Sequence, residues 1–531
     1  MKYKIFAIIL GLCSVGLSGC DKEFVSINTD PEHVTPATMN YAYLFTAAEL
    51  ITSGNSDANA YEDWRNNLIY CSTMIQHLSS STTYWCGDKY LYNSGYNSAY
   101  WEQNYGDPIK NIQDVVGNIK DQTDQANFYN IARIFRAFMF QRMTDMYGDC
   151  PYSEAGQGYL QGITSPKYDK QSDIYADMLN ELKEAAGALD ASAPNTVGSA
   201  DVLYGGDVAK WKKFAYSEML RLAMRMVKVD AAQAQQWAQT AVSGGVMSSI
   251  DDNALFSHNG YTPGTATIFG SGWVLDGVDA NASRISTMFM NVLKSTNDPR
   301  LPYIATVSTN PNDVSDLGDN TPSIQKGQPN GWDNGGGPTD IKNAPGYPGN
   351  QNLYSIVNRQ TWSRYDAPTY FLTYAETSLL EAEAVVRGWI TGDAATFYNN
   401  GVRAAMDQYG QMSASESSSP ATLPAIPQGD IDTYLAANPY NPGDAINQIN
   451  TQYWIATFMD EYESWANWRR TGYPVLLPVP AYVGNVTNGQ VPRRFTYSVG
   501  EVSTNADNYA AAVQDLDNGD KMTSHMWWDK P

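Results

Sequence analysis

Apolar residues recur at three- and four-residue steps along most of this chain, the spacing that places them on one face of an α-helix. The clearest stretch is 128–146, where phenylalanine, isoleucine and methionine occupy nearly every side of the predicted helix. A helix that is apolar nearly all round is usually buried. The stretch ends at Tyr147-Gly148-Asp149, before Pro151, which is a helix-ending signal. We therefore expect a buried helix here.

The same periodicity predicts further helices before and after this one. Their ranges are 42–51, 64–78, 101–120, 172–189, 211–229, 231–242, 285–293, 369–389, 394–409 and 446–468. The short link Thr391-Gly392-Asp393 joins two of them, so these two should pack as an antiparallel pair. We predict one mostly α unit that contains few short strands.

The helical pattern largely fails between Met247 and Pro368, where Gly, Asn, Asp and Pro gather, notably in Gly331–Pro338. A long region of loops inside a large protein is more often functional than idle. The last sixty residues contain Pro474, Pro478, Pro480 and Pro492 and should be irregular and surface-wrapping.

The N-terminus has the pattern of an export signal. Lys2 and Lys4 precede an apolar run from Ile5 to Leu17, and Ser18-Gly19-Cys20 follows it. A cysteine directly after small residues is the pattern of a bacterial lipobox, in which the thiol is acylated. We predict a signal peptide over 1–19, a lipid anchor at Cys20 and a polar tether over 20–39. The alternative is a plain signal in which Cys20 is incidental.

Charge narrows the classes of partner. Lysine and arginine number 34 against 56 acidic residues, for a net charge of −22. Two lysines leave with the signal, so the mature chain is near 32 minus 56, or −24. Such a field disfavours nucleic acid and anionic lipid surfaces. No later apolar run approaches the length of a membrane span.

Three cysteines remain in the mature chain besides the anchor: Cys71, Cys86 and Cys150. Export permits a Cys71–Cys86 disulfide, but the odd count argues against a disulfide framework. We favour free buried thiols over one bridge.

No catalytic or metal-binding motif stands out. The four histidines lie far apart, and neither a zinc-binding pair, a nucleophile elbow nor a phosphate loop is present. Segments 313–319 and 333–335 have oxygen-rich spacing that would suit calcium, but solvated turns are the favoured interpretation. We therefore predict no cofactor, with structural calcium left unsupported. The chain has enough carboxylates to supply the acid pair of a glycosidase, but the sequence alone does not show which two lie at the required separation.

An aromatic run is the strongest indication of binding. Aromatic residues are 12% of the chain, with 36 tyrosines and 14 tryptophans, and seven fall between Tyr84 and Trp101 in a polar setting. Aromatic faces stack on sugar rings, although filling of the core is the default role for each ring. Side chains of Asn, Asp and Gln would supply polar contacts. The ligand-binding candidates are Tyr84, Trp85, Tyr90, Tyr92, Trp273, Trp332, Trp362, Asn93, Asp333 and Asn334.

Several short sequence motifs, taken in their order along the chain, resemble those of the SusD/RagB family of outer-membrane nutrient-binding lipoproteins of Bacteroidetes. They are the lipobox followed by Asn28-Thr29-Asp30-Pro31, the run Thr144-Asp145-Met146-Tyr147-Gly148-Asp149, Asp298-Pro299-Arg300, Leu380-Glu381-Ala382-Glu383, Trp465-Ala466-Asn467-Trp468-Arg469-Arg470-Thr471-Gly472-Tyr473-Pro474, Pro492-Arg493-Arg494-Phe495 and Trp527-Trp528-Asp529. Ser498 and Cys150 depart from the commoner residues of one branch.

The resemblance implies a SusD-like domain over 40–531, built on tetratricopeptide-like helix pairs, with the loop-rich region 247–368 on the ligand side. It also implies a lipid-anchored protein on the extracellular side of the outer membrane. Its expected partner is a SusC-like TonB-dependent transporter that the protein caps, with the helical repeats contacting the barrel. The family does not need catalytic residues.

Three functions remain open from the sequence. The first is capture of an oligosaccharide for delivery to the transporter. The second keeps the architecture but takes peptides, and the third is a surface glycoside hydrolase. A purely adhesive lipoprotein is a further possibility.

Overall fold

The computed structural model describes residues 39–54, 63–258, 270–413 and 422–531. The predicted signal peptide and Cys20 lie outside the described residues, as does all of the tether except its last residue, so these stay predictions. From Ala42 to Pro531 the chain is one compact unit. None of its described helices combines the length and apolar character needed to cross a bilayer.

Helices dominate the described part, as the periodicity predicts. The main ones are α3 (Tyr41–Ser53), α4 (Ser94–Gly106), α5 (Pro108–Ile119), α6 (Ala126–Tyr147), α7 (Gly158–Gln161), α8 (Gln171–Ala188), α9 (Val208–Arg225), α10 (Ala231–Gly244), α12 (Thr287–Ser295), α14 (Tyr374–Val386), α15 (Ala394–Ser413), α16 (Gln428–Ala437), α17 (Ala445–Ala456), α18 (Glu461–Thr471), α19 (Glu501–Thr504) and α20 (Ala506–Gln514), together with the π-helices η1 (Asp63–Ser72) and η7 (Val274–Val278).

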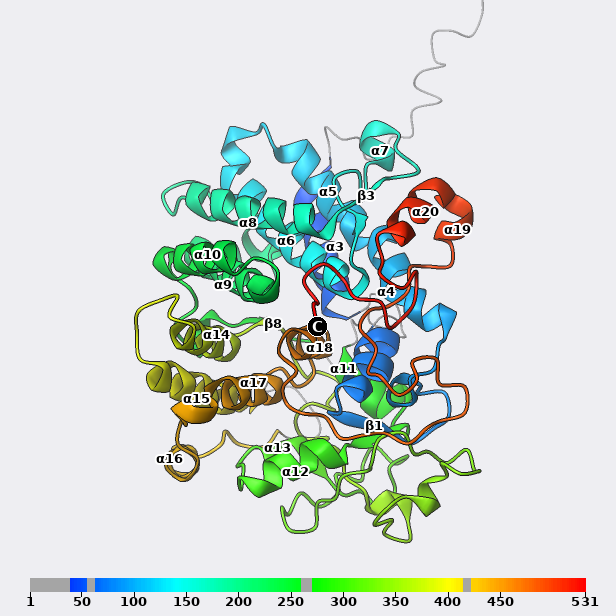
Figure 1. Cartoon of the computed structure of the whole chain (residues 1–531). Helices are drawn as coiled ribbons and strands as arrows, with labels where there is room; N and C mark the ends of the chain where they lie inside the picture. The colour runs from blue at the N-terminus through cyan, green and yellow to red at the C-terminus, as the bar shows by residue number, and fades with distance from the viewer. Residues whose placement is uncertain (1–38, 55–62, 259–269, 414–421) are drawn as a thin grey trace, which may run out of the picture. The chain divides into compact units, whose positions relative to one another are not determined.

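Consecutive helices pack in pairs. Helix α6 packs against α8, α8 and α10 both pack against α9, and α14 packs against α15 and α17; Figure 1 shows α9, α10, α14 and α15 following one another along one side. The pair α14–α15 is antiparallel, as predicted: Ser378 Oγ donates to the Phe397 carbonyl at 2.9 Å. A Cβ at Gly401 would lie 3.0 Å from the Ala375 carbonyl oxygen, so glycine permits this close approach.

Four of the predicted helices differ from the structure. The range 64–78 contains a π-helix that ends at Ser72, and 101–120 is broken between α4 and α5, because Pro108 lacks an N–H and restricts the residue before it. The range 446–468 is broken between α17 and α18, where Met459 has φ 78°.

The fourth, 369–389, begins as a strand rather than a helix. Residues Thr369–Leu372 form β8, which pairs antiparallel with β4 (Ala254–Phe256). Short apolar runs fit either a buried helix or a strand, so the pairing with a distant segment decided the outcome.

Within the described residues the strands are short and occur as four separate two-stranded pairs. Besides β4–β8 these are β1 (Leu78–Ser80) with β5 (Ser283–Ile285), β2 (Cys150–Pro151) with β3 (Tyr168–Asp169), and β6 (Ala305–Thr306) with β7 (Ile356–Val357). The pair β1–β5 joins the segment after η1 to the loop-rich region, which the structure fills with short elements such as α11 (Ser271–Trp273), α13 (Leu301–Ile304), η8 (Ile341–Asn343) and η9 (Gln351–Leu353).

Buried charges connect the helices at the centre of the unit. Arg225 on α9 contacts Asp145 on α6 at 3.2 Å and Glu463 on α18 at 2.6 Å. Arg221, one turn earlier, contacts Glu376 on α14 at 3.0 Å. All five side chains are buried. Charges removed from water are tolerated only when paired, so this chain of ion pairs sets which helices can be neighbours.

A second buried pair links α14 to α18. Arg470 donates to both carboxylate oxygens of Glu383, at 2.6 and 2.7 Å. Burial alone would raise the pKa of Glu383, but Arg470 and Arg387 outweigh it and lower the pKa to about 2. Glu383 is therefore ionised in the folded protein.

The C-terminal residues close the other side of α18. Trp528 is buried, and its Nε1 donates to Asp145 Oδ1 at 2.9 Å. The Arg469 guanidinium lies between the Trp465 ring (3.8 Å) and the Trp528 ring (4.9 Å). Burial lowers the pKa of Arg469 to about 10. The irregular tail thus completes the core instead of only wrapping it.

Candidate functional site

Three aromatic side chains from two segments donate to one carboxylate, Asp279, which lies directly after η7 and about two hundred residues away in sequence. Trp64 Nε1 donates to Asp279 Oδ2 at 2.5 Å and Trp85 Nε1 donates to the same oxygen at 2.7 Å. The Tyr84 hydroxyl donates to Oδ1. We call these four residues the aromatic node. Because all three rings donate to one buried acceptor, their orientations are fixed relative to one another.

The node presents aromatic surface to solvent. Tyr84 is 41% exposed and Trp64 is half-buried, whereas Trp85 is fully buried beneath them. Burial is the main cause that raises the pKa of Tyr84, and the hydrogen bond to Asp279 raises it further. The hydroxyl therefore stays protonated and can donate. The Arg65 guanidinium lies 4.9 Å from the Trp64 ring centroid and 5.6 Å from that of Tyr96. Half-exposed rings flanked by a cation are suited to stacking on a ligand.

A second loop, 331–335, lies against the loop that carries Tyr84. The Asn334 N–H donates to the Ser81 carbonyl at 3.2 Å. A Cβ at Gly335 would lie 2.4 Å from Thr83 Cγ2, so only glycine allows the approach. Asp333 is buried and pairs with Lys89 at 2.8 Å. The fold therefore joins the aromatic run to the loop-rich region, the two parts that the sequence singled out separately.

Amide side chains border the same loops. Gln351 Nε2 donates to Gln328 Oε1 at 3.2 Å, and Arg284 Nη2 donates to Asn281 Oδ1 at 2.5 Å. Asn281 and Gln351 are partly exposed, and Asn334 is exposed. Amides offer both donors and acceptors, which is what hydroxyl-rich ligands require.

The ten residues predicted from sequence fall into two groups. Tyr84, Tyr92, Asn93 and Asn334 are exposed, and Trp273 and Trp332 are half-buried. Trp85, Tyr90, Trp362 and Asp333 are buried, so they offer a ligand no free face in this structure. Asn93 caps α4 by accepting from the Tyr96 N–H at 3.1 Å.

Trp273 and Trp332 have packing roles as well. The Trp273 ring meets Tyr365 edge-on, with centroids 5.0 Å apart. Trp332 packs on a small cluster of Ile341, Ala344 and Tyr354. Trp273 starts the turn that leads through η7 to Asp279, so it lies next to the node in sequence.

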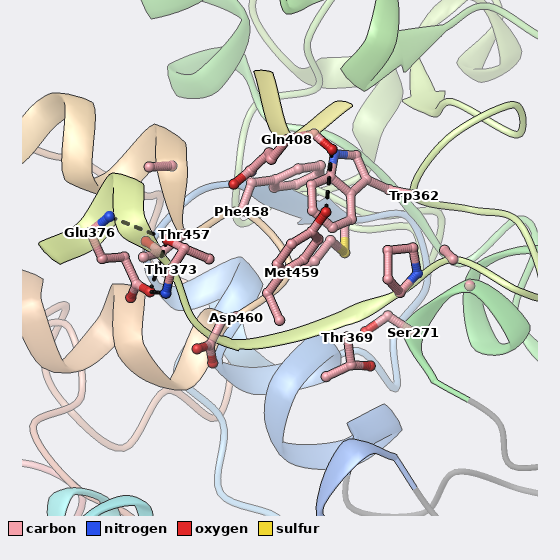
Figure 2. Close-up of a pocket in the computed structure, with 15 residues that line it drawn as sticks. Ser271, Trp362, Thr369, Thr373, Glu376, Gln408, Thr457, Phe458, Met459 and Asp460 are labelled. Atoms are coloured by element: carbon pink, nitrogen blue, oxygen red, sulfur yellow. Dashed lines mark hydrogen bonds between the residues drawn. The ribbon is translucent and has the colours of Figure 1, made fainter. Parts of the chain in front are cut away.

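Trp362 lines an internal cavity and not the surface. Figure 2 shows it with Phe458, Met459 and Gln408 around this space, and its Nε1 donates to the Tyr409 hydroxyl at 3.1 Å. The cavity measures about 20 Å³. That volume holds a water molecule and not a nutrient.

Sequence reasoning missed Trp64, Arg65 and Asp279. The periodicity places Trp64 at the start of a predicted helix, and nothing in the spacing of a lone aspartate indicates that three rings meet on it. The one available signal was the aromatic run itself, which contains Tyr84 and Trp85.

The carboxylates of this face are already engaged by the protein. Asp279 accepts from the three rings, and Asp333 accepts from the Tyr482 hydroxyl at 2.9 Å as well as from Lys89. Asp276 pairs with Arg359 at 2.5 Å, and burial raises its pKa to about 6. These acids hold neighbouring side chains of the protein in position.

The segments considered for calcium use their oxygens in local turns. Asp316 accepts from the Asn310 N–H at 3.0 Å and the Gly318 N–H at 3.0 Å, and Asp313 accepts from Ser315. Within the described residues, no group of three or more His, Cys, Asp or Glu is arranged to hold a metal ion. Cys71, Cys86 and Cys150 are free and buried, as favoured from sequence.

Comparisons with known proteins agree over nearly the whole chain. Residues 37–498 match the SusD-like family model described as starch-binding and associating with the outer membrane. A solved chitin-binding protein is 33% identical, with a TM-score of 0.77, covering 93% of this chain and 100% of its own. A SusD-like protein from Bacteroidetes is 28% identical, with the same TM-score and coverage.

A third solved structure, a chitin-binding SusD homologue from Flavobacterium johnsoniae, is 24% identical with a TM-score of 0.72, and covers 92% of this chain and 99% of its own. At that identity it supports the fold. No curated protein matches the chain significantly.

Proposed function

Because this chain belongs to the SusD-like family, we propose that it is a surface lipoprotein that binds an oligosaccharide at the aromatic node and delivers it to a SusC-like TonB-dependent transporter. In this proposal the signal peptide (1–19) is removed, Cys20 carries the lipid and residues 20–39 tether the binding domain (40–531). The ligand is bound and released without catalysis.

The observation that carries the proposal is the aromatic node. Tyr84 and Trp64 are held by Asp279 with part of each ring exposed, next to a loop whose Asn334 is exposed. A pyranose ring has apolar C–H faces and equatorial hydroxyls, so it matches rings bordered by amides. The relative named as a chitin-binding protein, at 33% identity, favours a neutral glycan as cargo, and the net charge of −22 is consistent with an uncharged ligand.

Rigid placement also suits delivery. A binding protein that must unload its cargo benefits from modest affinity and fast dissociation. A few stacked rings and exchangeable hydrogen bonds supply that affinity, and pre-oriented rings reduce the entropy lost on binding.

The test is calorimetry on the chain from Asp21 onward with N-acetylchitohexaose and maltohexaose. We expect Tyr84→Ala to weaken binding of whichever probe binds by about 1–3 kcal/mol, the scale of an aromatic hot spot. The matched control is Tyr159→Ala, because Tyr159 is a 72% exposed tyrosine on α7. Equal affinities for the two variants would contradict the site. Trp85→Ala is a poor test, since that ring is buried.

Two further measurements address the rest of the proposal. Prolonged incubation of the chain with the bound probe should release no new reducing ends, and their appearance would indicate a hydrolase. In cells, Cys20→Ala should abolish fatty-acid labelling, and purification of the wild-type protein should recover a TonB-dependent barrel.

A further inference from the structure

A concave surface is lined by Tyr92, which belongs to the same aromatic run as Tyr84. Its volume is about 490 Å³, within the range of roughly 300–1,000 Å³ typical of ligand sites. Its lining includes Tyr92 and residues of the C-terminal part of the chain, among them Val486, Val499, Val502, Tyr509, Asp520 and Lys521. We call it the tyrosine groove.

The groove is apolar at its rim and well anchored at its base. Tyr92, Val486, Val499 and Val502 are 44%, 52%, 52% and 56% exposed. At the base, Asp520 accepts from the Tyr497 N–H at 3.1 Å and from the Tyr509 hydroxyl at 3.2 Å. Arg494 donates to the same carboxylate at 2.5 Å. The groove therefore has a fixed floor beneath exposed apolar side chains.

A short stretch of chain, residues 482–486, links the wall of the groove to the loop beside the aromatic node. Tyr482 donates to Asp333, next to Asn334, and four residues later the Val486 N–H donates to the Tyr90 carbonyl at 3.1 Å. Four residues span at most roughly 14 Å. Tyr84 of the node and Tyr92 of the groove also belong to the same aromatic run. One stretch of chain thus leads from the loop beside the node to the wall of the groove.

We propose that the tyrosine groove is a second sugar-binding subsite and that the protein takes an extended glycan chain whose further units lie there. This rests on the proposed function. A polymer is the ligand class that can occupy two connected sites at once. The lining fits a sugar, because tyrosine and valine surfaces can cover the apolar face of a pyranose, while Asp520 and Lys521 in the same lining can bind its hydroxyls.

The experiment compares a short and a long probe of the series that binds, for example N-acetylchitotriose and N-acetylchitohexaose. In the wild type we expect the long probe to bind at least about tenfold more tightly, since a second contact on the same chain adds avidity. Tyr92→Ala should reduce that ratio to below about threefold while leaving the short-probe affinity unchanged. Val499→Ser should act in the same direction, and Tyr159→Ala should change neither value.

The outcomes separate the two proposals. Suppose that Tyr84→Ala weakens binding of both probes, while Tyr92→Ala and Val499→Ser leave the ratio of long-probe to short-probe affinity unchanged. That result would overturn the second subsite and leave the first site standing. Variants that keep the ratio but lose the co-purified barrel would also overturn it, in favour of a protein-contact surface. Failure of the wild type to bind either series would contradict both proposals together.

Discussion

The helical scaffold and the loop face of this protein bury polar groups in different ways. In the scaffold, arginines meet carboxylates from other helices, as Arg225 meets Asp145 and Glu463. On the loop face, charged side chains bind the backbone as well as one another: Arg359 pairs with Asp276 and also donates to the carbonyls of Asp313 at 2.8 Å and Asp316 at 2.6 Å.

Asp88 illustrates the second pattern. Its carboxylate accepts from the Ser80 N–H at 3.0 Å, the Ser80 hydroxyl at 2.7 Å and the Gly331 N–H at 3.1 Å. A helix satisfies its own backbone groups, whereas buried irregular chain needs side chains to do so. The difference teaches why the loop-rich region is rich in Asn, Asp and Gln, and why loops without regular structure can still hold the node in place.

Breaking a helix-to-helix ion pair should have the largest effect. Glu383→Ala leaves Arg470 as an uncompensated buried charge, which costs about 3–5 kcal/mol of unfolding free energy. Chemical denaturation measures this cost. The control is Asp432→Ala, which removes the exposed partner of Arg403 and should cost about 0–1 kcal/mol. Equal costs would mean that burial does not distinguish these pairs.

The buried carboxylate of Glu381 should make the scaffold sensitive to pH. Burial raises the pKa of Glu381 to about 8. The folded state therefore holds a proton that the unfolded state loses near pH 4.5, and the stability this contributes is present at low pH and lost as pH rises through 8. Relative to wild type, Glu381→Gln should gain roughly 2–3 kcal/mol between pH 5 and pH 8. Thermal melts across this range measure the gain, and a pH-independent difference would contradict the assignment.

Removing a side chain that serves the loop backbone should cost less than breaking the ion pair. Asp88→Ala leaves the Ser80 and Gly331 amides without their acceptor, so we expect a loss of about 1–3 kcal/mol. Hydrogen exchange should rise locally at residues 78–90 and 328–335. The control is Asp319→Ala, since Asp319 is exposed and accepts within its own turn. If hydrogen exchange rose throughout the helices as well, the helical scaffold and the loop face would unfold together rather than independently, which would contradict this prediction.

The smallest expected effect is the reactivity of the buried thiols toward a thiol reagent in the native protein. Burial raises the pKa of Cys86 to about 11 and also raises the pKa of Cys71. A buried, protonated thiol is a poor nucleophile. The native chain from Asp21 onward should not react with a thiol reagent near neutral pH, and unfolding should expose all three cysteines. Fast labelling of the native protein would show that the loops around Cys86 open readily.

The helical part was largely predictable because helix formation is local. Residues 128–146 were predicted and α6 spans Ala126–Tyr147, since the apolar period and the Gly148 stop signal both lie within the segment. Where a distant partner decides, prediction failed: Thr369–Leu372 is a strand because it pairs with Ala254–Phe256.

The candidate site was half predictable. The aromatic run pointed to Tyr84 and Tyr92, but composition cannot tell an exposed ring from a buried one, and Trp85, Tyr90 and Trp362 proved to be buried. Which rings face outward depends on what covers them, and that is a property of contacts between distant segments.

By itself the sequence determined the mostly helical class, the helix pairs and the two regions that carry the aromatic and loop-forming residues. Only the tertiary structure decided that Trp64, Tyr84 and Trp85 share Asp279 and that residues 331–335 lie beside them. The physical reason is range: periodicity and turn chemistry act over a few residues, whereas one carboxylate binding three rings depends on contacts across about two hundred residues of chain.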